Sequence, residues 1–255
     1  MKKILLLIAC LFTTGLQAWE CKFEESIDEQ LDLTGTELLS ISAAAGDLEI
    51  TGVKAGSTAR IKGRLCVSDE DWLDESGVSV SGGREASIVV DLPRAESNWS
   101  LTNSKYAYLD LEIEVPEGMA LDVRDSSGNL SIERTGAVNV MDSSGDIEIE
   151  GINGSAVVKD SSGDIVFRNI GGDVIIESDS SGDIRGTDIH GTVLVRSDSS
   201  GDIRFRDVGE NYIVERDSSG DITADGVGGD FRVLQDGSGD IEASNVQGEV
   251  VTPAG

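Results

Sequence analysis

The stretch that decides the fold is SDSSGDIRGTDIHGTVLVRSDSSGDIRFRD, residues 178–207, in which the letters DSSGD occur twice, 19 residues apart. The same turn recurs along the second half of the chain, as DSSGN once, DSSGD five times and DGSGD once. Successive turn glycines are separated by 17, 18, 19, 19, 19 and 19 residues: Gly128, Gly145, Gly163, Gly182, Gly201, Gly220 and Gly239. Self-similarity at a fixed short period is the sequence signature of a repeat protein.

Each copy of the repeat reads as two short strands. An apolar residue stands two positions after the glycine and usually another stands four positions after it, as with Ile165 and Phe167, which is the alternation of a strand. A second turn, usually with glycine, leads to a second strand such as VII, VLV, YIV or FRV. No proline occurs between Pro116 and Pro253, as continuous strand pairing requires.

A unit of this size cannot bury its own apolar face, but a stack of such units can. We therefore predict an all-β protein whose repeats form a single-chain, parallel β-solenoid of about seven coils, each 17–19 residues long. Neighbouring coils would lie about 4.8 Å apart, the spacing of paired strands. The core would then consist of columns of like residues: Ile165, Ile184, Ile203, Ile222 and Ile241 in one, and Val174, Val193, Tyr212, Phe231 and Val250 in another.

The front of the mature chain differs from the repeats. Residues 19–120 hold all three tryptophans and read as separate strands punctuated by turns, although AAAGDLEITG at 43–52 resembles a solenoid turn. Because an uncapped solenoid would expose unpaired strand edges, we predict a capping β region over 19–120 and the solenoid over 121–255.

Residues 1–18 read as a secretory signal peptide. Lys2 and Lys3 precede an apolar run at 4–12, and Ala18 ends a small-residue cleavage context. The run is too short to span a bilayer, and we expect no transmembrane segment elsewhere.

Export with a lipid anchor is the alternative to ordinary export. LIAC, residues 7–10, resembles a lipoprotein cleavage box, so lipidation at Cys10 stands beside ordinary export. Either way we expect an exported protein of the periplasm or cell envelope, or one secreted further.

The charge of the chain restricts its partners. The net charge is −28, and removal of the signal peptide takes away Lys2 and Lys3 and no acids, which gives −30. This argues against binding to nucleic acid, which needs a basic footprint, and against docking on anionic lipid. Solubility and cation binding remain as interpretations of the acidic charge.

Two cysteines remain after cleavage, Cys21 and Cys66. In an oxidising compartment we expect them to form a disulfide that ties the N-terminus to the first domain, with two reduced thiols as the alternative. Two thiols and a single histidine cannot make a structural zinc site.

One stretch carries a family resemblance. LDLEIEVPEGMALDVRDSSGNLSIE, residues 109–133, followed by the SSGDI repeats, resembles the bacterial putative-adhesin family, a domain of β-strand repeats. The resemblance covers roughly residues 38–252 and implies an exported, β-helix-like envelope protein. It supplies no catalytic residues. The near-constant Asp before Ser-Ser-Gly departs from the pattern we expect of the family.

The DSSGD motif has a structural and a functional interpretation. Asp at the first position and Gly at the fourth suit a type I turn, with the Asp side chain accepting a backbone hydrogen bond. Stacking would also align the acids in two columns, where carboxylates about 4.8 Å apart repel by about 0.9 kcal/mol per pair in bulk water. Calcium, which binds six to eight oxygens, would relieve that repulsion. The tentative ligands are Asp160, Asp164, Asp179, Asp183, Asp198, Asp202, Asp217 and Asp221.

A second apolar column runs one residue out of phase with the core. Ile175, Leu194 and Ile213 would form a partner surface if they face outward, or would fill the core if a bulge turns them inward. The single histidine, His190, lies in a variable turn and reads as a surface residue. Short coils without insertions build no cleft, so we expect no catalysis; a polysaccharide lyase is the distant alternative.

These observations predict a non-catalytic, adhesin-like interaction module of the envelope or cell surface. Its partner would be a protein or polysaccharide of the cell envelope, and no cofactor is expected. The alternative is a calcium-binding or polysaccharide-binding solenoid that uses stacked Asp ladders.

Overall fold

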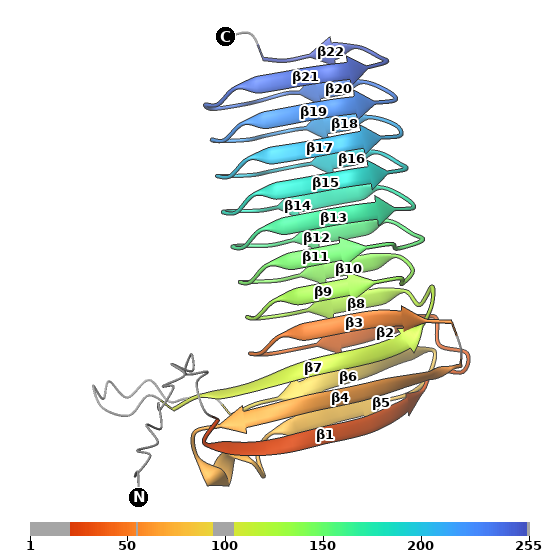
Figure 1. Ribbon diagram of the computed structural model, residues 1–255, viewed down its shortest axis with the longest axis vertical. Helices are drawn as coiled ribbons and strands as arrows, with labels where there is room; N and C mark the ends of the chain where they lie inside the picture. Colours follow the sequence, from red (N-terminus) through yellow and green to blue (C-terminus); the bar gives the residue numbers. More distant parts are fainter. Residues whose placement is uncertain (1–20, 55, 94–104, 254–255) are drawn as a thin grey trace, which may run out of the picture.

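The computed structural model describes residues 21–54, 56–93 and 105–253; the expected signal peptide at 1–18 and Cys10 lie outside them. Two eleven-stranded sheets face each other along a rod (Figure 1). We call them sheet A, in the order β1-β4-β7-β3-β9-β11-β13-β15-β17-β19-β21, and sheet B, in the order β22-β20-β18-β16-β14-β12-β10-β8-β2-β6-β5. The predicted all-β solenoid is confirmed.

Each coil contributes one strand to each sheet, and the strands of neighbouring coils are parallel. The coil strands of sheet A are β3 (Leu48–Val53), β9 (Leu130–Glu133), β11 (Ile147–Glu150), β13 (Ile165–Ile170), β15 (Ile184–Ile189), β17 (Ile203–Val208), β19 (Ile222–Val227) and β21 (Ile241–Val246). Those of sheet B are β2 (Leu38–Ser42), β8 (Leu121–Arg124), β10 (Val138–Met141), β12 (Ala156–Lys159), β14 (Val174–Ser178), β16 (Val193–Val195), β18 (Tyr212–Val214), β20 (Phe231–Val233) and β22 (Val250–Val251).

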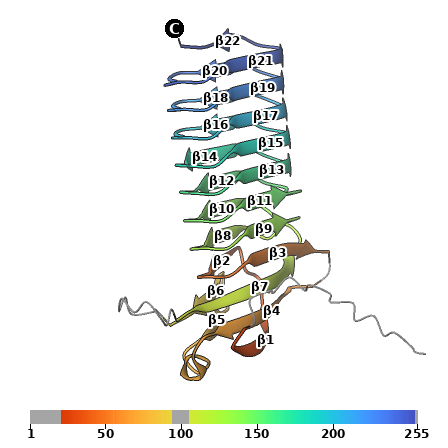
Figure 2. The same ribbon diagram turned by 60° about the vertical axis from the view of Figure 1, so that its left-hand side comes forward.

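Antiparallel strands close the N-terminal end of the rod. In sheet A, β4 (Thr58–Val67) pairs antiparallel with β1 (Phe23–Asp32) on one side and with β7 (Ala107–Pro116) on the other. In sheet B, β5 (Gly77–Ser81) pairs antiparallel with β6 (Glu85–Asp91). A short 3-10 turn, Glu70–Trp72, precedes β5, and Figure 2 shows these strands gathered below the coils.

The parallel stack begins earlier than the expected residue 121. β2 pairs in parallel with β8, and β3 pairs in parallel with β9, so the segment containing AAAGDLEITG forms a coil of the solenoid itself. The same two strands also pair in parallel with β6 and β7. The capping strands therefore join the stack through this early coil.

The predicted core columns are confirmed by the strand register. Ile165, Ile184, Ile203 and Ile222 are paired in turn and fully buried, as are the members of the second column from Val174 to Phe231. Only the last coil departs from this pattern, with Ile241 half-buried and Val250 exposed by 52 %. Each coil stabilises the next by covering these apolar side chains.

A glycine lets large core rings approach across one coil. Gly186 lies between Phe167 and Phe205 in the register of sheet A. The two ring centroids lie only 6.3 Å apart, although two strand spacings amount to about 9.6 Å. A Cβ on Gly186 would overlap the Phe205 ring, so the ring fills the space that the glycine leaves.

Candidate functional site

The DSSGD turn is a corner that brings successive coils into close backbone contact. Gly201 has φ +132°, a conformation that side chains disfavour, and a Cβ there would overlap the carbonyl oxygen of Gly182. The Gly201 N–H donates to the Ser219 carbonyl of the next coil at 3.2 Å, and the Ser200 hydroxyl donates to the Ser180 carbonyl of the preceding one at 3.1 Å. The predicted role of the motif as a corner therefore has a direct geometric basis.

The first Asp of each turn points into the rod. The members of this inner Asp column are each at most 5 % exposed: Asp125, Asp142, Asp160, Asp179, Asp198 and Asp217. At Asp198, Oδ1 accepts the Ser199 N–H at 2.7 Å, while Oδ2 is buried and accepts no hydrogen bond from the described residues. Oδ2 of Asp142, Asp179 and Asp217 is likewise buried and accepts no hydrogen bond from the described residues.

Burial shifts the titration of the inner Asp column. Loss of hydration, together with the negative charges of the neighbouring Asp179 and Asp217, raises the pKa of Asp198 to about 7. Loss of hydration is also the largest cause that raises the pKa of Asp125 to about 7 and that of Asp160 to about 6. A carboxyl in such a place is held largely neutral in mildly acidic solution.

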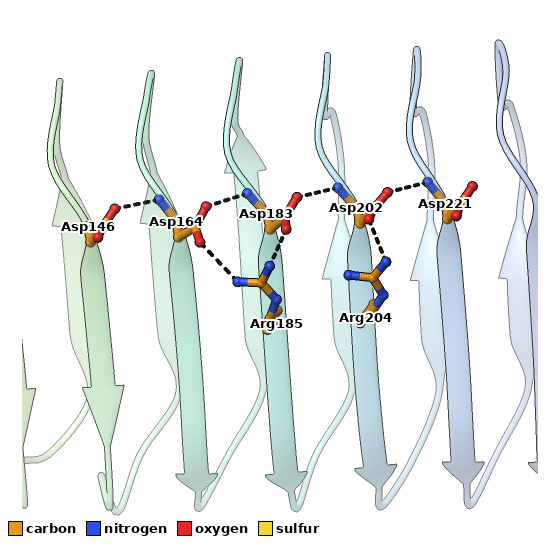
Figure 3. A network of polar contacts seen from close by, with 7 residues as sticks. All are labelled: Asp146, Asp164, Asp183, Arg185, Asp202, Arg204 and Asp221. Atoms are coloured by element: carbon orange, nitrogen blue, oxygen red, sulfur yellow. Dashed lines mark hydrogen bonds and ion pairs between the residues drawn. The ribbon is translucent and has the colours of Figure 1, made fainter.

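The second Asp of each turn lies on the surface and binds the backbone of the next coil. In this outer Asp column the backbone N–H of one Asp donates to Oδ1 of the preceding one, at 2.8 Å from Asp202 to Asp183 and at 2.9 Å from Asp183 to Asp164 (Figure 3). The chain continues from Asp146 to Asp240. These hydrogen bonds are the largest cause that lowers the pKa of Asp164 and Asp202.

Arginines neutralise part of the outer column. Arg185 contacts the carboxylates of both Asp164, at 2.9 Å, and Asp183, and Arg204 donates to Asp202 at 2.5 Å (Figure 3). The carboxylates of Asp164, Asp183 and Asp202 therefore each bind a backbone amide and a guanidinium group.

The eight tentative calcium ligands divide between the two columns. Asp160, Asp179, Asp198 and Asp217 lie inside the rod, whereas Asp164, Asp183, Asp202 and Asp221 lie on its surface. Within the described ranges, no three His, Cys, Asp or Glu side chains are grouped as a metal site would require. The motif thus places its two acids in different environments, which the sequence pattern did not indicate.

The out-of-phase apolar column faces outward on sheet B. Ile175 stands between the buried Val174 and Ile176, and Leu194 and Ile213 are in the same position on their strands. These three side chains are paired in register and half-buried, so the strand has no bulge that would turn them inward. Val157 on β12 extends the row by one coil. We call these four residues the apolar row.

The other residues singled out in the sequence lie away from this row. Cys21 and Cys66 form a disulfide, with their Cα atoms 5.6 Å apart, at the N-terminal end of the rod. His190 is exposed in the turn after β15. Among the described residues, no helix is long and apolar enough to cross a membrane.

Comparison with known proteins finds a solved structure that shares this fold. No protein-family model and no curated protein matches the chain. A solved structure described as a putative adhesin from Bacteroides fragilis matches with a TM-score of 0.53 and 12 % identity, over 90 % of this chain and 97 % of that one. A putative cell adhesion protein from Clostridium sporogenes aligns at 14 % identity over 91 % of this chain and 100 % of that one, with a TM-score of 0.34. The B. fragilis structure shares the fold, which confirms the expected resemblance at that level.

Proposed function

We propose that this chain is a non-catalytic, exported interaction module of the cell envelope, which binds its partner through the outer face of sheet B. The observation that carries the proposal is the apolar row, in which Val157, Ile175, Leu194 and Ile213 lie side by side on four successive coils. Contiguous apolar side chains on a protein surface are typical of interaction sites.

The charge of the chain supports an apolar mode of contact. A protein with a net charge of −28 is repelled by most acidic surfaces, whereas the affinity of apolar side chains does not depend on charge. A flat apolar row supplies such affinity toward the apolar patch of a protein or the aliphatic face of a sugar ring. We therefore expect an envelope protein or polysaccharide as the partner.

The test measures binding to the envelope directly. The exported chain, residues 19–255, is cosedimented with washed envelopes of the bacterium that encodes it. We expect Ile175→Gln combined with Leu194→Gln to remove most binding, because the two substitutions place polar groups in the middle of the apolar row. Both side chains are only half-buried and so remain accessible to a partner. The control Leu234→Gln changes a leucine exposed by 57 % outside the row and should bind normally. Normal binding by the double variant, folded by circular dichroism, would contradict the proposal.

Calcium binding by the inner Asp column is the second candidate. The observation that favours it is the line of buried Oδ2 atoms without a hydrogen-bond donor among the described residues, at Asp142, Asp179, Asp198 and Asp217. A calcium-specific rise in melting temperature, relative to EDTA at fixed ionic strength, would support this candidate. An unchanged melting temperature would exclude it and leave neutral carboxyls as the explanation.

A further inference from the structure

Four arginines gather on the outer face of sheet A, the sheet opposite the apolar row. Arg185 and Arg204 are paired directly across β15 and β17. Thr187 is paired with Arg168 on one side and with Arg206 on the other. The four arginines therefore lie around Thr187 on three successive coils, whose paired strands are about 4.8 Å apart.

This cluster lines a hollow in the surface. A cavity of about 440 Å³ lies over β13, β15 and β17. Its lining consists of all four arginines together with Val166, Phe167, Gly186 and Thr187. The site was not visible in the sequence, because Arg168 and Arg206 are 38 residues apart and become neighbours of Thr187 only through the register of the coils.

The hollow gathers four arginines on an otherwise acidic surface. Glu148 and Glu150 occupy the equivalent outward positions one coil before Arg168, and Asp225 and Glu242 occupy them beyond Arg206. In a chain of net charge −28, this local concentration of positive groups is the exception. The acidic borders limit the length of any anion that the hollow accepts.

The arginines are held in place but retain free donors. Arg185 is fixed by Asp164 and Asp183, and Arg204 by Asp202. Arg168 is held by Glu148. Arg206 is paired in the strand register with Asp225 of the next coil. A guanidinium group has five N–H donors, so these contacts leave donors available on every arginine of the cluster.

We propose that the hollow binds a short acidic oligosaccharide through its carboxylate or sulfate groups. Planar guanidinium groups bind such anions with paired hydrogen bonds, and arginines repeated from coil to coil suit an anion repeated from sugar to sugar. Nucleic acid would need a longer basic footprint than the acidic borders leave. The site is independent of the apolar row, because the two lie on opposite sheets.

The test is calorimetric titration of the chain 19–255 at fixed ionic strength with tetragalacturonate and with a sulfated tetrasaccharide. We expect one of these probes to bind, and Arg204→Gln combined with Arg206→Gln to weaken it by about tenfold or more, since two charge-assisted contacts are lost. The matched control is Arg196→Gln, which removes an exposed arginine paired with Glu177 on the other side of the coil and should leave affinity unchanged. Added salt should weaken binding.

Thr187→Glu provides a second variant, which places a negative charge between Arg168 and Arg206 without removing an arginine and should also abolish binding. The proposal is overturned if neither acidic probe binds, or if maltotetraose binds as tightly. It is also overturned if the arginine variant and the Arg196→Gln control bind alike. Equal, arginine-dependent binding of a single-stranded oligonucleotide would overturn the assignment to a glycan.

Discussion

Replacing Asp198 by Asn tests whether the inner Asp column is neutral. Asn keeps an oxygen that can accept the Ser199 N–H, now 2.7 Å from Oδ1, but it cannot ionise. The groups that face Asp198 in the column are Asp179 and Asp217, so a negative charge at this position meets like charges on both sides and has no paired cation. The substitution therefore removes one buried ionisation and keeps its shape.

The magnitude follows from the raised pKa. The pKa of Asp198 moves from 3.8 to about 7 on folding, so the folded chain keeps a proton that the unfolded chain loses between these values. The stability from the neutral carboxyl is therefore fully present below pH 3.8 and is lost as the pH rises to about 7. The full effect is about 4 kcal/mol, of which about 3 kcal/mol is lost between about pH 5 and pH 8.

The assay is urea unfolding followed by circular dichroism at about pH 5 and about pH 8, in EDTA. The wild-type chain should lose stability as the pH rises, because Asp125 and Asp160 also have raised pKa values. The stability of Asp198→Asn relative to wild type should increase by about 3 kcal/mol between the two pH values. A relative stability that is unchanged, or that falls at the higher pH, would refute the neutral column.

Three substitutions test the contacts between coils, each by urea unfolding. Gly201→Ala should lower the free energy of unfolding by about 3 kcal/mol or more, since its Cβ would overlap the Gly182 carbonyl. The control Gly35→Ala, at φ +78° with no atom within 4 Å of the added Cβ, should lower it by about 1 kcal/mol. Gly186→Ala should cost about 1–3 kcal/mol by crowding Phe205, and no loss would contradict that packing. Asp183→Ala should lower the free energy of unfolding by about 1–3 kcal/mol, because the Asp202 N–H loses its acceptor. An equal loss of stability in Ser79→Ala, which removes an exposed hydroxyl, would refute this role of Asp183.

The repeat made the core predictable. Once the glycines are aligned, Ile184 must lie beside Ile203, because the side chains of strands alternate and a coil stacks on the next in register. The same alignment placed Leu194 beside Ile213 and left only their direction open.

The orientation of the two acids was not predictable from the same alignment. Alternation fixes the direction of a side chain only within a strand, and Asp198 lies in the corner between β16 and β17, where no such alternation applies. The alignment therefore placed the acids in two columns without showing how their environments differ, whereas burial raises the pKa of the inner acids and backbone amides bind the outer ones.

The place of the early coil in the stack was not predictable for a different reason, although its turn resembles those of the solenoid. β2 and β3 are separated from β8 and β9 by the antiparallel strands β4 to β7, so their stacking partners lie about 80 residues away in the chain rather than one period away. The arginine cluster was hidden in the same way, because it belongs to the surface that the register creates and to no local motif.

Hydroxyl-radical footprinting of the chain 19–255, with and without bacterial envelope material, tests most directly whether sheet B binds the partner. We predict that oxidation of Ile175, Leu194 and Ile213 falls on binding, while the exposed Met141 and Leu234, outside the row, react as before. Unchanged oxidation of the apolar row, with protection appearing elsewhere on the coils, would contradict the claim that sheet B carries the partner.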